Sequence, residues 1–173
     1  FGSTSMEYSA VVYPVFMFAL TIVAFFLFVR KLFLDELGEN KANIVSLIAS
    51  IILTLSPSLL PRTIAGIPEK ESTAFLFMFL AFFFFLSAWK EKSPIKRYIH
   101  AILAGVSTAA MALIWGGFAY IVITLGLSFF LVFMFYTFSI SKVEASDKEE
   151  IPVKVYPLGH SILMFLFGLV MLV

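Results

Sequence analysis

The sequence predicts an all-α protein, a polytopic transmembrane helix bundle of about six helices. Three observations support this fold class: 61% of the 173 residues are hydrophobic, only 13% are charged, and the apolar residues fall into six long stretches. A water-soluble domain carries about a quarter charged residues, and a spanning helix needs about 20 predominantly apolar residues. Because the polar residues that would cover a soluble globule are missing, lipid must surround most of the chain.

The expected spans follow one another with short connections. In chain order they are residues 8–29, 42–60, 73–89, 98–115 and 118–140, and a last span that begins near Pro157. The polar stretch 38–41 separates the first two, and Gly116 and Gly117 alone separate the fourth from the fifth. Pro57 falls inside the second span, where we expect a kink because proline lacks the backbone N–H of a helical hydrogen bond.

The two ends of the sequence favour a partial chain. It begins with Phe1 rather than Met and stops at Val173, inside an apolar run. We therefore expect residues 1–173 to be a transmembrane domain fragment of a longer protein, with no soluble domain of its own.

The distribution of Lys and Arg predicts the orientation in the membrane. One set of alternating connections contains ten of the twelve: Arg30, Lys31, Lys41, Lys90, Lys92, Lys96, Arg97, Lys142, Lys148 and Lys154. The opposite set contains only Arg62 and Lys70. Since cytoplasmic loops are enriched in Lys and Arg, we expect a multi-pass protein of the cell membrane with its N-terminus and residues 61–72 on the external face.

Composition also excludes several classes of function. A net charge of +1, without a basic stripe beside exposed aromatic residues, opposes nucleic acid as a partner. The absence of cysteine removes disulfides and thiolate metal sites. The ionisable residues lie between the apolar stretches or at their ends, whereas a transport pathway needs them inside the membrane.

Residues 61–72 contain the candidate chemistry. Glu69 and Glu71 are one residue apart, so both carboxylates can face the same side of an extended or turned backbone. Pro68 disfavours a helix at the residue before it, and Mg²⁺ prefers carboxylate oxygens. An alternative is that the two glutamates begin the next helix, where negative charge complements the helix dipole, while Arg62 reaches the headgroups. The residue types leave both interpretations open.

The order of motifs resembles the catalytic subunit of oligosaccharyltransferase, in its archaeal form. That family has an Arg-Ser/Thr-x-Ala/Ser-Gly turn, a second acidic motif of the form Asp/Glu-x-Asp/Glu that begins seven residues after the Arg, and a later Trp-Gly-Gly-Tyr loop. Here the turn is residues 62–66, directly after Pro61, the acids are Glu69 and Glu71, and the loop begins at Trp115. The chain departs from the usual pattern in having Phe118 for the Tyr and in using glutamate at both acidic positions, where the family usually has Asp in at least one.

The resemblance implies a GT-C type glycosyltransferase that moves a glycan from a lipid-linked (poly)prenyl phosphate or diphosphate to Asn in Asn-x-Ser/Thr of an acceptor polypeptide. It implies that Glu69 and Glu71 bind Mg²⁺ or Mn²⁺, and that Arg62 completes the catalytic set by positioning them or facing the anionic substrate. It further implies a place beside the lipid-linked oligosaccharide for Trp115, Gly116 and Gly117.

Other motifs of that family are not found in the 173 residues: its first acidic motif, and the Trp-Trp-Asp-Tyr-Gly type motif that recognises the acceptor. We therefore expect the fragment to be inactive without the remainder of the parent chain. Two alternatives stay open on the sequence: another GT-C enzyme that uses lipid-phosphate sugars, and a non-enzymatic multi-pass subunit.

Overall fold

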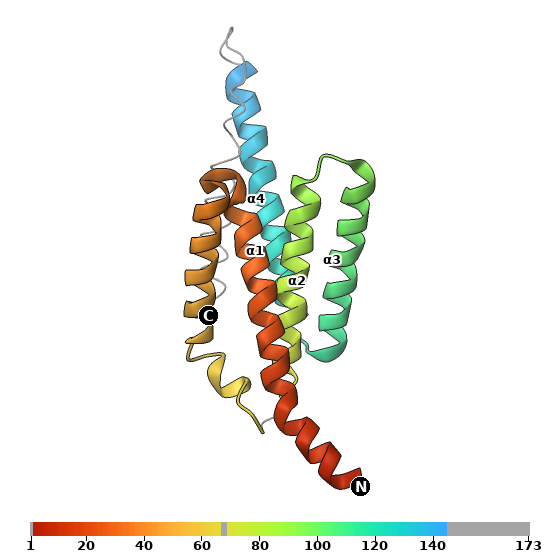
Figure 1. Ribbon diagram of the computed structural model, residues 1–173. Helices are drawn as coiled ribbons and strands as arrows, with labels where there is room; N and C mark the ends of the chain where they lie inside the picture. Colours follow the sequence, from red (N-terminus) through yellow and green to blue (C-terminus); the bar gives the residue numbers. More distant parts are fainter. Residues whose placement is uncertain (1, 67–68, 145–173) are drawn as a thin grey trace. The chain divides into compact units, whose positions relative to one another are not determined.

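The described part of the chain, residues 2–66 and 69–144 of a computed structural model, contains helices and no strands. Its elements are α1 (Gly2–Thr54), the short 3₁₀ helix η1 (Leu60–Arg62), α2 (Glu71–Lys90), α3 (Pro94–Ile114) and α4 (Phe118–Glu144) (Figure 1). Four of these helices are long and apolar enough to cross a membrane. The predicted all-α transmembrane fold is confirmed, while the last expected span, from Pro157, lies outside the described residues.

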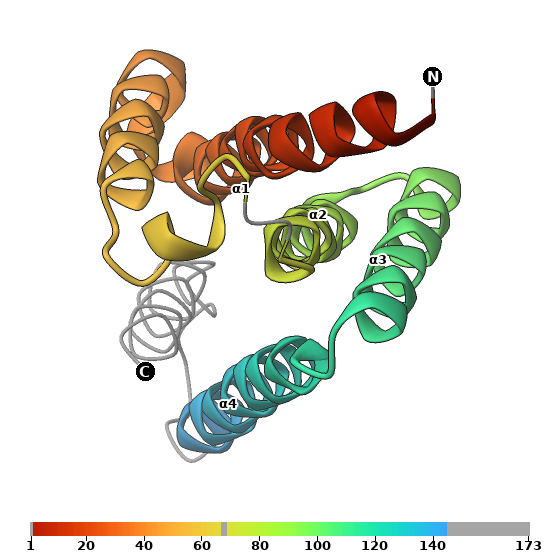
Figure 2. The same ribbon diagram turned by 90° about the horizontal axis from the view of Figure 1, so that it is seen from below.

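The chain divides into two compact units, Phe1–Phe118 and Ala119–Val173. In the first, α2 packs against both α1 and α3, and Figure 2 shows it between them. Aromatic side chains fill the α1–α2 contact, where the ring centroids of Phe25 and Phe79 are 4.8 Å apart. In the second unit, α4 is an apolar helix whose buried residues Ile121, Thr124 and Ser128 recur at helical spacing.

The helix α1 consists of two arms that meet at Gly38. This glycine has φ 75° and ψ 170°, values outside the helical region, and the chain reverses direction there (Figure 1). A positive φ is readily adopted only by glycine. The apolar stretch Glu7–Thr54 has 48 residues, about 70 Å of helix against a hydrocarbon core of about 30 Å. The arms therefore correspond to the first two expected spans.

The predicted end of the second span is wrong. The helix stops at Thr54 rather than continuing to residue 60, and Pro57 lies beyond its end instead of kinking it. Proline disfavours helical geometry at the preceding residue, and the amide of Ser56 instead donates to the Leu53 carbonyl in a turn. Hydropathy alone included the apolar Leu59 and Leu60 in the span, although their backbone belongs to the next connection.

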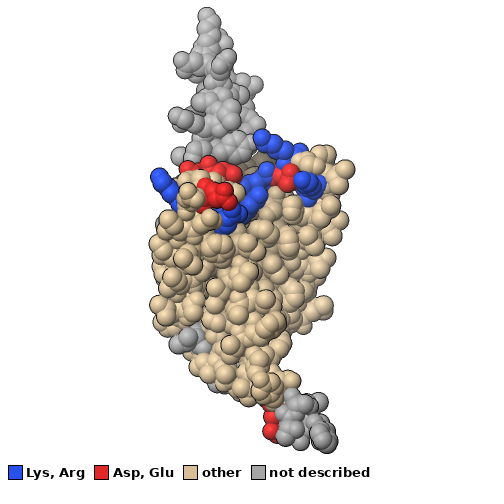
Figure 3. Space-filling view, viewed as in Figure 1, with Lys and Arg blue, Asp and Glu red and all other residues tan. Residues whose placement is uncertain are grey.

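Charged side chains gather at one end of the first unit, near Gly38 and the α2–α3 connection, and few charged side chains are seen on the face below them in Figure 3. Arg30 joins the two arms of α1 there: its Nη2 lies 2.8 Å from Glu39 Oε1, and its Nε donates to Asn43 Oδ1 at 2.7 Å. Lys90 Nζ joins α2 to α1 by donating to the carbonyls of Lys31 and Leu32 at 2.8 and 3.1 Å. The connection between α1 and α2 lies at the opposite end (Figure 1).

Candidate functional site

The connection from α1 to α2 has defined local structure on both sides of residues 67–68, which lie outside the described part. Thr63 is buried, and its hydroxyl donates to the Leu59 carbonyl at 3.1 Å. Gly66 has φ 87°, and its amide donates to the Val11 carbonyl of α1 at 3.4 Å. Because a residue with a Cβ rarely adopts that φ, glycine is what allows the connection to fold against the first arm of α1.

The start of α2 is also attached to α1, through hydroxyl groups. The hydroxyls of Tyr13 and Thr73 form a short hydrogen bond. One residue earlier, the Ser72 carbonyl accepts a hydrogen bond from Thr21 Oγ1 at 3.4 Å, and Ser72 Oγ donates to the Glu69 carbonyl at 2.8 Å. The backbone that carries the two candidate carboxylates is therefore hydrogen-bonded to the first arm of α1 and within itself.

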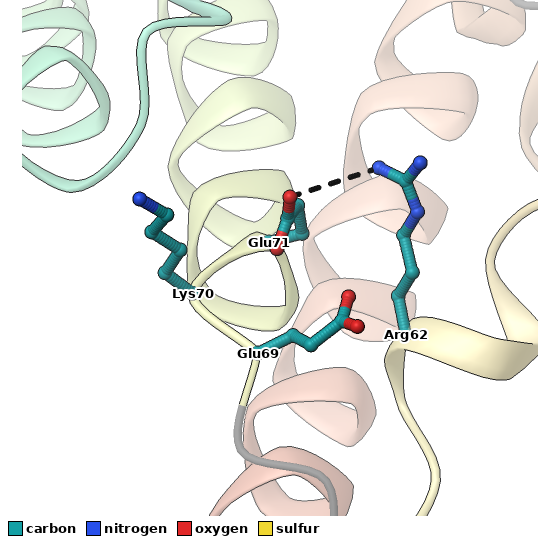
Figure 4. A pocket seen from close by; sticks show the side chains of 4 residues that line it. All are labelled: Arg62, Glu69, Lys70 and Glu71. Carbon is teal, nitrogen blue, oxygen red and sulfur yellow. Dashed lines mark ion pairs between the residues drawn. The ribbon is translucent and has the colours of Figure 1, made fainter.

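Four charged side chains line an open pocket of about 550 Å³ at this place: Arg62, Glu69, Lys70 and Glu71. In Figure 4 the side chains of Glu69 and Glu71 both extend towards Arg62, whereas Lys70 extends to the other side of the backbone. The structure thus brings together the three residues Arg62, Glu69 and Glu71 that the sequence singled out.

Arg62 and Glu71 form a loose ion pair. Arg62 Nη1 lies 3.8 Å from Glu71 Oε1, and the two side chains are 45% and 19% exposed. A charge-assisted hydrogen bond would be about 2.7–2.9 Å long, so the guanidinium is beside the carboxylate without being fixed to it. Both groups remain able to meet a ligand in the pocket.

Glu71 occupies the first residue of α2, two residues before the predicted start of that helix. Negative charge there complements the helix dipole, as the alternative interpretation expects of it. Glu69 precedes the helix, and its carboxylate faces the same pocket. A carboxylate in the first helical turn can also bind a cation. The position of Glu71 is therefore compatible both with a helix-capping charge and with a metal ligand.

The carboxylate pair fits a divalent cation that keeps other ligands. In the described ranges, no group of three or more His, Asp or Glu side chains is arranged to hold a metal ion. Mg²⁺ is commonly bound by one or two carboxylates together with waters and substrate phosphates, and Glu69 and Glu71 supply two carboxylates on one side of an open pocket. Their roles as metal ligands stay a prediction.

Comparison with protein families decides the identity of the chain. A model of the family described as oligosaccharyl transferase STT3, N-terminal, matches residues 3–172. The chain belongs to the STT3 family. No curated protein and no solved structure matches it. The resemblance to an oligosaccharyltransferase subunit is confirmed, and with it an oligosaccharyltransferase-type function in a multi-pass membrane protein.

In this STT3 chain, Trp115 lies where α3 ends and the chain turns towards α4. Its backbone is extended, and its amide donates to the Met111 carbonyl at 2.8 Å. Its ring contacts Phe75 of α2 edge to face, with the centroids 6.1 Å apart. Gly116 and Gly117 follow in the turn. The predicted contact of these three residues with a lipid-linked substrate stays a prediction.

Sequence reasoning missed the residues that support the site. Tyr13, Thr21 and Thr73 lie in apolar stretches outside the charged motif, and Ser72, at the end of residues 61–72, was given no role. The hydroxyl contacts between them join residues 51 and 60 positions apart in the chain. Hydroxyl residues inside an apolar span do indicate hydrogen bonds between helices. A single sequence does not show which two of them are paired.

Proposed function

We propose that this chain is the membrane part of an oligosaccharyltransferase that transfers a glycan from a lipid-linked (poly)prenyl phosphate or diphosphate to Asn in Asn-x-Ser/Thr of an acceptor polypeptide. The pocket of Arg62, Glu69, Lys70 and Glu71 is its metal and phosphate site, and this pocket faces the external side of the cell membrane. The family match supports the general reaction. The observation that carries the proposed site is the shared direction of Glu69 and Glu71 beside Arg62.

Three of these side chains have a role that fits their charge and place. Glu69 and Glu71 bind Mg²⁺ or Mn²⁺, and Arg62 faces the anionic phosphate of the donor from the opposite wall of the pocket. When bound, the cation stabilises negative charge on the departing phosphate oxygen. The bond between the sugar and that oxygen breaks, the sugar carbon bonds to the amide nitrogen, and the proton that the amide loses passes to the departing phosphate or to water.

The experiment is glycan transfer by the full-length parent polypeptide in membranes, with a lipid-linked donor and a labelled Asn-x-Thr peptide. We expect the double variant Glu69→Ala/Glu71→Ala to lose about 100-fold or more of the transfer rate, because the charge on the leaving group is no longer stabilised. Glu36→Gln is the matched control, since Glu36 is an exposed glutamate near Gly38 at the other end of the unit.

Two results would count against the proposal. If the double variant transfers glycan at the wild-type rate, Glu69 and Glu71 do not form a metal site that transfer requires. If a peptide with Gln in place of Asn is modified equally well, the proposed specificity for Asn is wrong.

We also propose that residues 1–173 need the remainder of the parent chain. The described pocket offers two carboxylates and two cations and no further group to recognise an acceptor. We expect membranes containing only this segment to transfer no glycan in the same assay, and detectable transfer would refute this part of the proposal.

A further inference from the structure

We propose that Trp115 is a positioning residue for Glu71, that it acts through Phe75, and that Gly117 is required because the Trp115 ring lies over it. The inference rests on the proposed role of Glu71 as a metal ligand. It assigns Trp115 to packing against α2 rather than to direct contact with the lipid-linked donor.

The first step is the place of Phe75. It follows Glu71 by four residues in α2, so the two side chains lie one above the other on the same face of the helix. The Trp115 ring meets Phe75 at an interplanar angle of 63°, an edge contact that is favourable between aromatic rings. Trp115 therefore packs on α2 one helical turn from the candidate metal ligand.

The second step is the fit of the ring to its own turn. A Cβ added to Gly117 would lie 1.9, 2.2 and 2.4 Å from three carbon atoms of the Trp115 ring. No side chain can be accommodated there unless the ring moves. A glycine at this position thus lets the ring fold back across the turn and reach Phe75.

The third step is the need for outside support at the start of α2. Its N-cap residue, Lys70, makes no side-chain capping hydrogen bond. A helix end without a cap is less stable by about 1 kcal/mol. From the α1 side, Thr73 is held by Tyr13. Trp115 holds Phe75 from the α3 side, so the turn that begins with Glu71 is supported by contacts from two neighbouring elements.

The test measures Mn²⁺ affinity directly, by electron paramagnetic resonance of free Mn²⁺ with the purified full-length protein, so that binding is separated from turnover. We expect Trp115→Ala and Gly117→Ala to raise the Kd for Mn²⁺ about threefold to tenfold, the range that corresponds to one lost aromatic contact. Trp115→Phe keeps an aromatic ring and should restore most of the affinity. A high Mn²⁺ concentration should partly restore the rate of glycan transfer by Trp115→Ala and by Gly117→Ala.

Trp89→Ala is the matched control. Trp89 lies near the other end of α2, the helix that begins with Glu71. It has an aromatic contact of its own, with its ring centroid 6.2 Å from that of Phe85. We expect Trp89→Ala to leave the Kd for Mn²⁺ unchanged. If Trp115→Ala does not give a folded protein, as judged by its thermal unfolding midpoint, Gly117→Ala still decides the question.

Two outcomes overturn the inference. An unchanged Kd for Mn²⁺ in Gly117→Ala and in folded Trp115→Ala shows that the ring does not position Glu71. A raised KM for the lipid-linked donor at an unchanged Kd for Mn²⁺ shows that Trp115 contacts the donor instead. Failure of the proposed metal site is a separate result, seen when Glu71→Ala itself leaves Mn²⁺ binding intact.

Discussion

At the scale of single residues, the loose pair of Arg62 and Glu71 limits what Arg62 can do. An exposed ion pair contributes at most about 1 kcal/mol, and the 3.8 Å separation lacks the geometry of a bidentate hydrogen bond. Holding Glu71 in place is therefore a minor part of the role of Arg62. Its positive charge at the wall of the pocket is better suited to a phosphate, because guanidinium groups bind phosphate through two parallel hydrogen bonds.

We predict that Arg62→Gln raises the KM for the lipid-linked donor about tenfold or more, the effect of losing one hydrogen-bonded charge. The Kd for Mn²⁺ should change by less than about threefold, because the ion pair with Glu71 is weak. Donor titration and Mn²⁺ binding on the same membranes distinguish the two quantities. Arg62→Lys should recover only part of the donor affinity, since an ammonium cannot make the paired contact. A large change in the Kd for Mn²⁺ with a normal KM would assign Arg62 to the carboxylates.

Gly66 provides a second prediction at this scale. Gly66→Ala should lower the stability of the connection by about 1 kcal/mol, because φ 87° is unfavourable for alanine. A Cβ at this position meets nothing within 4 Å, so the cost comes from the backbone alone. We expect a lower thermal unfolding midpoint in detergent. Gly105→Ala is the control, since Gly105 is helical, also has free space around it and should tolerate alanine without loss. Equal midpoints for the two variants would contradict the argument.

The sequence predicted that the two glutamates can face the same side. It did not predict the hydrogen bonds that hold the backbone carrying them. Spacing by one residue allowed both carboxylates to face one side, and Figure 4 shows them there. The hydrogen bond between Tyr13 and Thr73 depends on how α1 packs against α2. Packing of helices is determined by side chains distant in sequence, and neither residue differs in its local pattern from other hydroxyl residues in the spans.

At the scale of elements, hydropathy located the helices but not their ends. It counts apolar side chains whether or not the backbone is helical, so it extended the second span past Pro57. It also excluded polar first turns: α2 begins at Glu71 and α3 at Pro94, each a few residues before the predicted start. Acidic residues and proline are favourable at the first positions of a helix because its N-terminal amides are unpaired.

Lys90 leads to a prediction about how two elements are joined. Its ammonium is nearly buried, lies 2.8 Å from Asp35 Oδ2 and donates to two carbonyls of α1. Lys90→Met keeps the apolar stem and removes these contacts, and we expect a loss of about 2 kcal/mol in stability. Lys92→Met is the control, because Lys92 is exposed in the same connection. The thermal unfolding midpoint should fall for the first variant only. An equal fall in both would mean that the contacts of Lys90 do not hold α2 to α1.

At the scale of the whole molecule, the sequence predicted that successive connections alternate between two ends. In the unit Phe1–Phe118, the break at Gly38 and the α2–α3 connection lie at one end, and the pocket connection lies at the other (Figure 1). Seven of the nine Lys and Arg residues in this unit belong to the first end: Arg30, Lys31, Lys41, Lys90, Lys92, Lys96 and Arg97. Geometry and charge thus agree on the two ends, whereas the side of the membrane that each faces follows from the charge bias alone.

That orientation can be tested with single cysteines, because the 173 residues contain none. Ser58 lies in the α1–α2 connection, which carries the pocket, and Ser93 lies in the α2–α3 connection. Ser58→Cys and Ser93→Cys therefore place a cysteine at opposite ends of the helices. In intact cells that produce the full-length protein, a membrane-impermeant maleimide should label Ser58→Cys, while Ser93→Cys should react only after permeabilisation. The parent without either substitution measures background labelling. The expectation follows because seven cations near Ser93 hold that end on the cytoplasmic side, where the anionic leaflet attracts them. The opposite labelling pattern would put the pocket in the cytoplasm, away from an external acceptor polypeptide, and would contradict both the orientation and the proposed site of transfer.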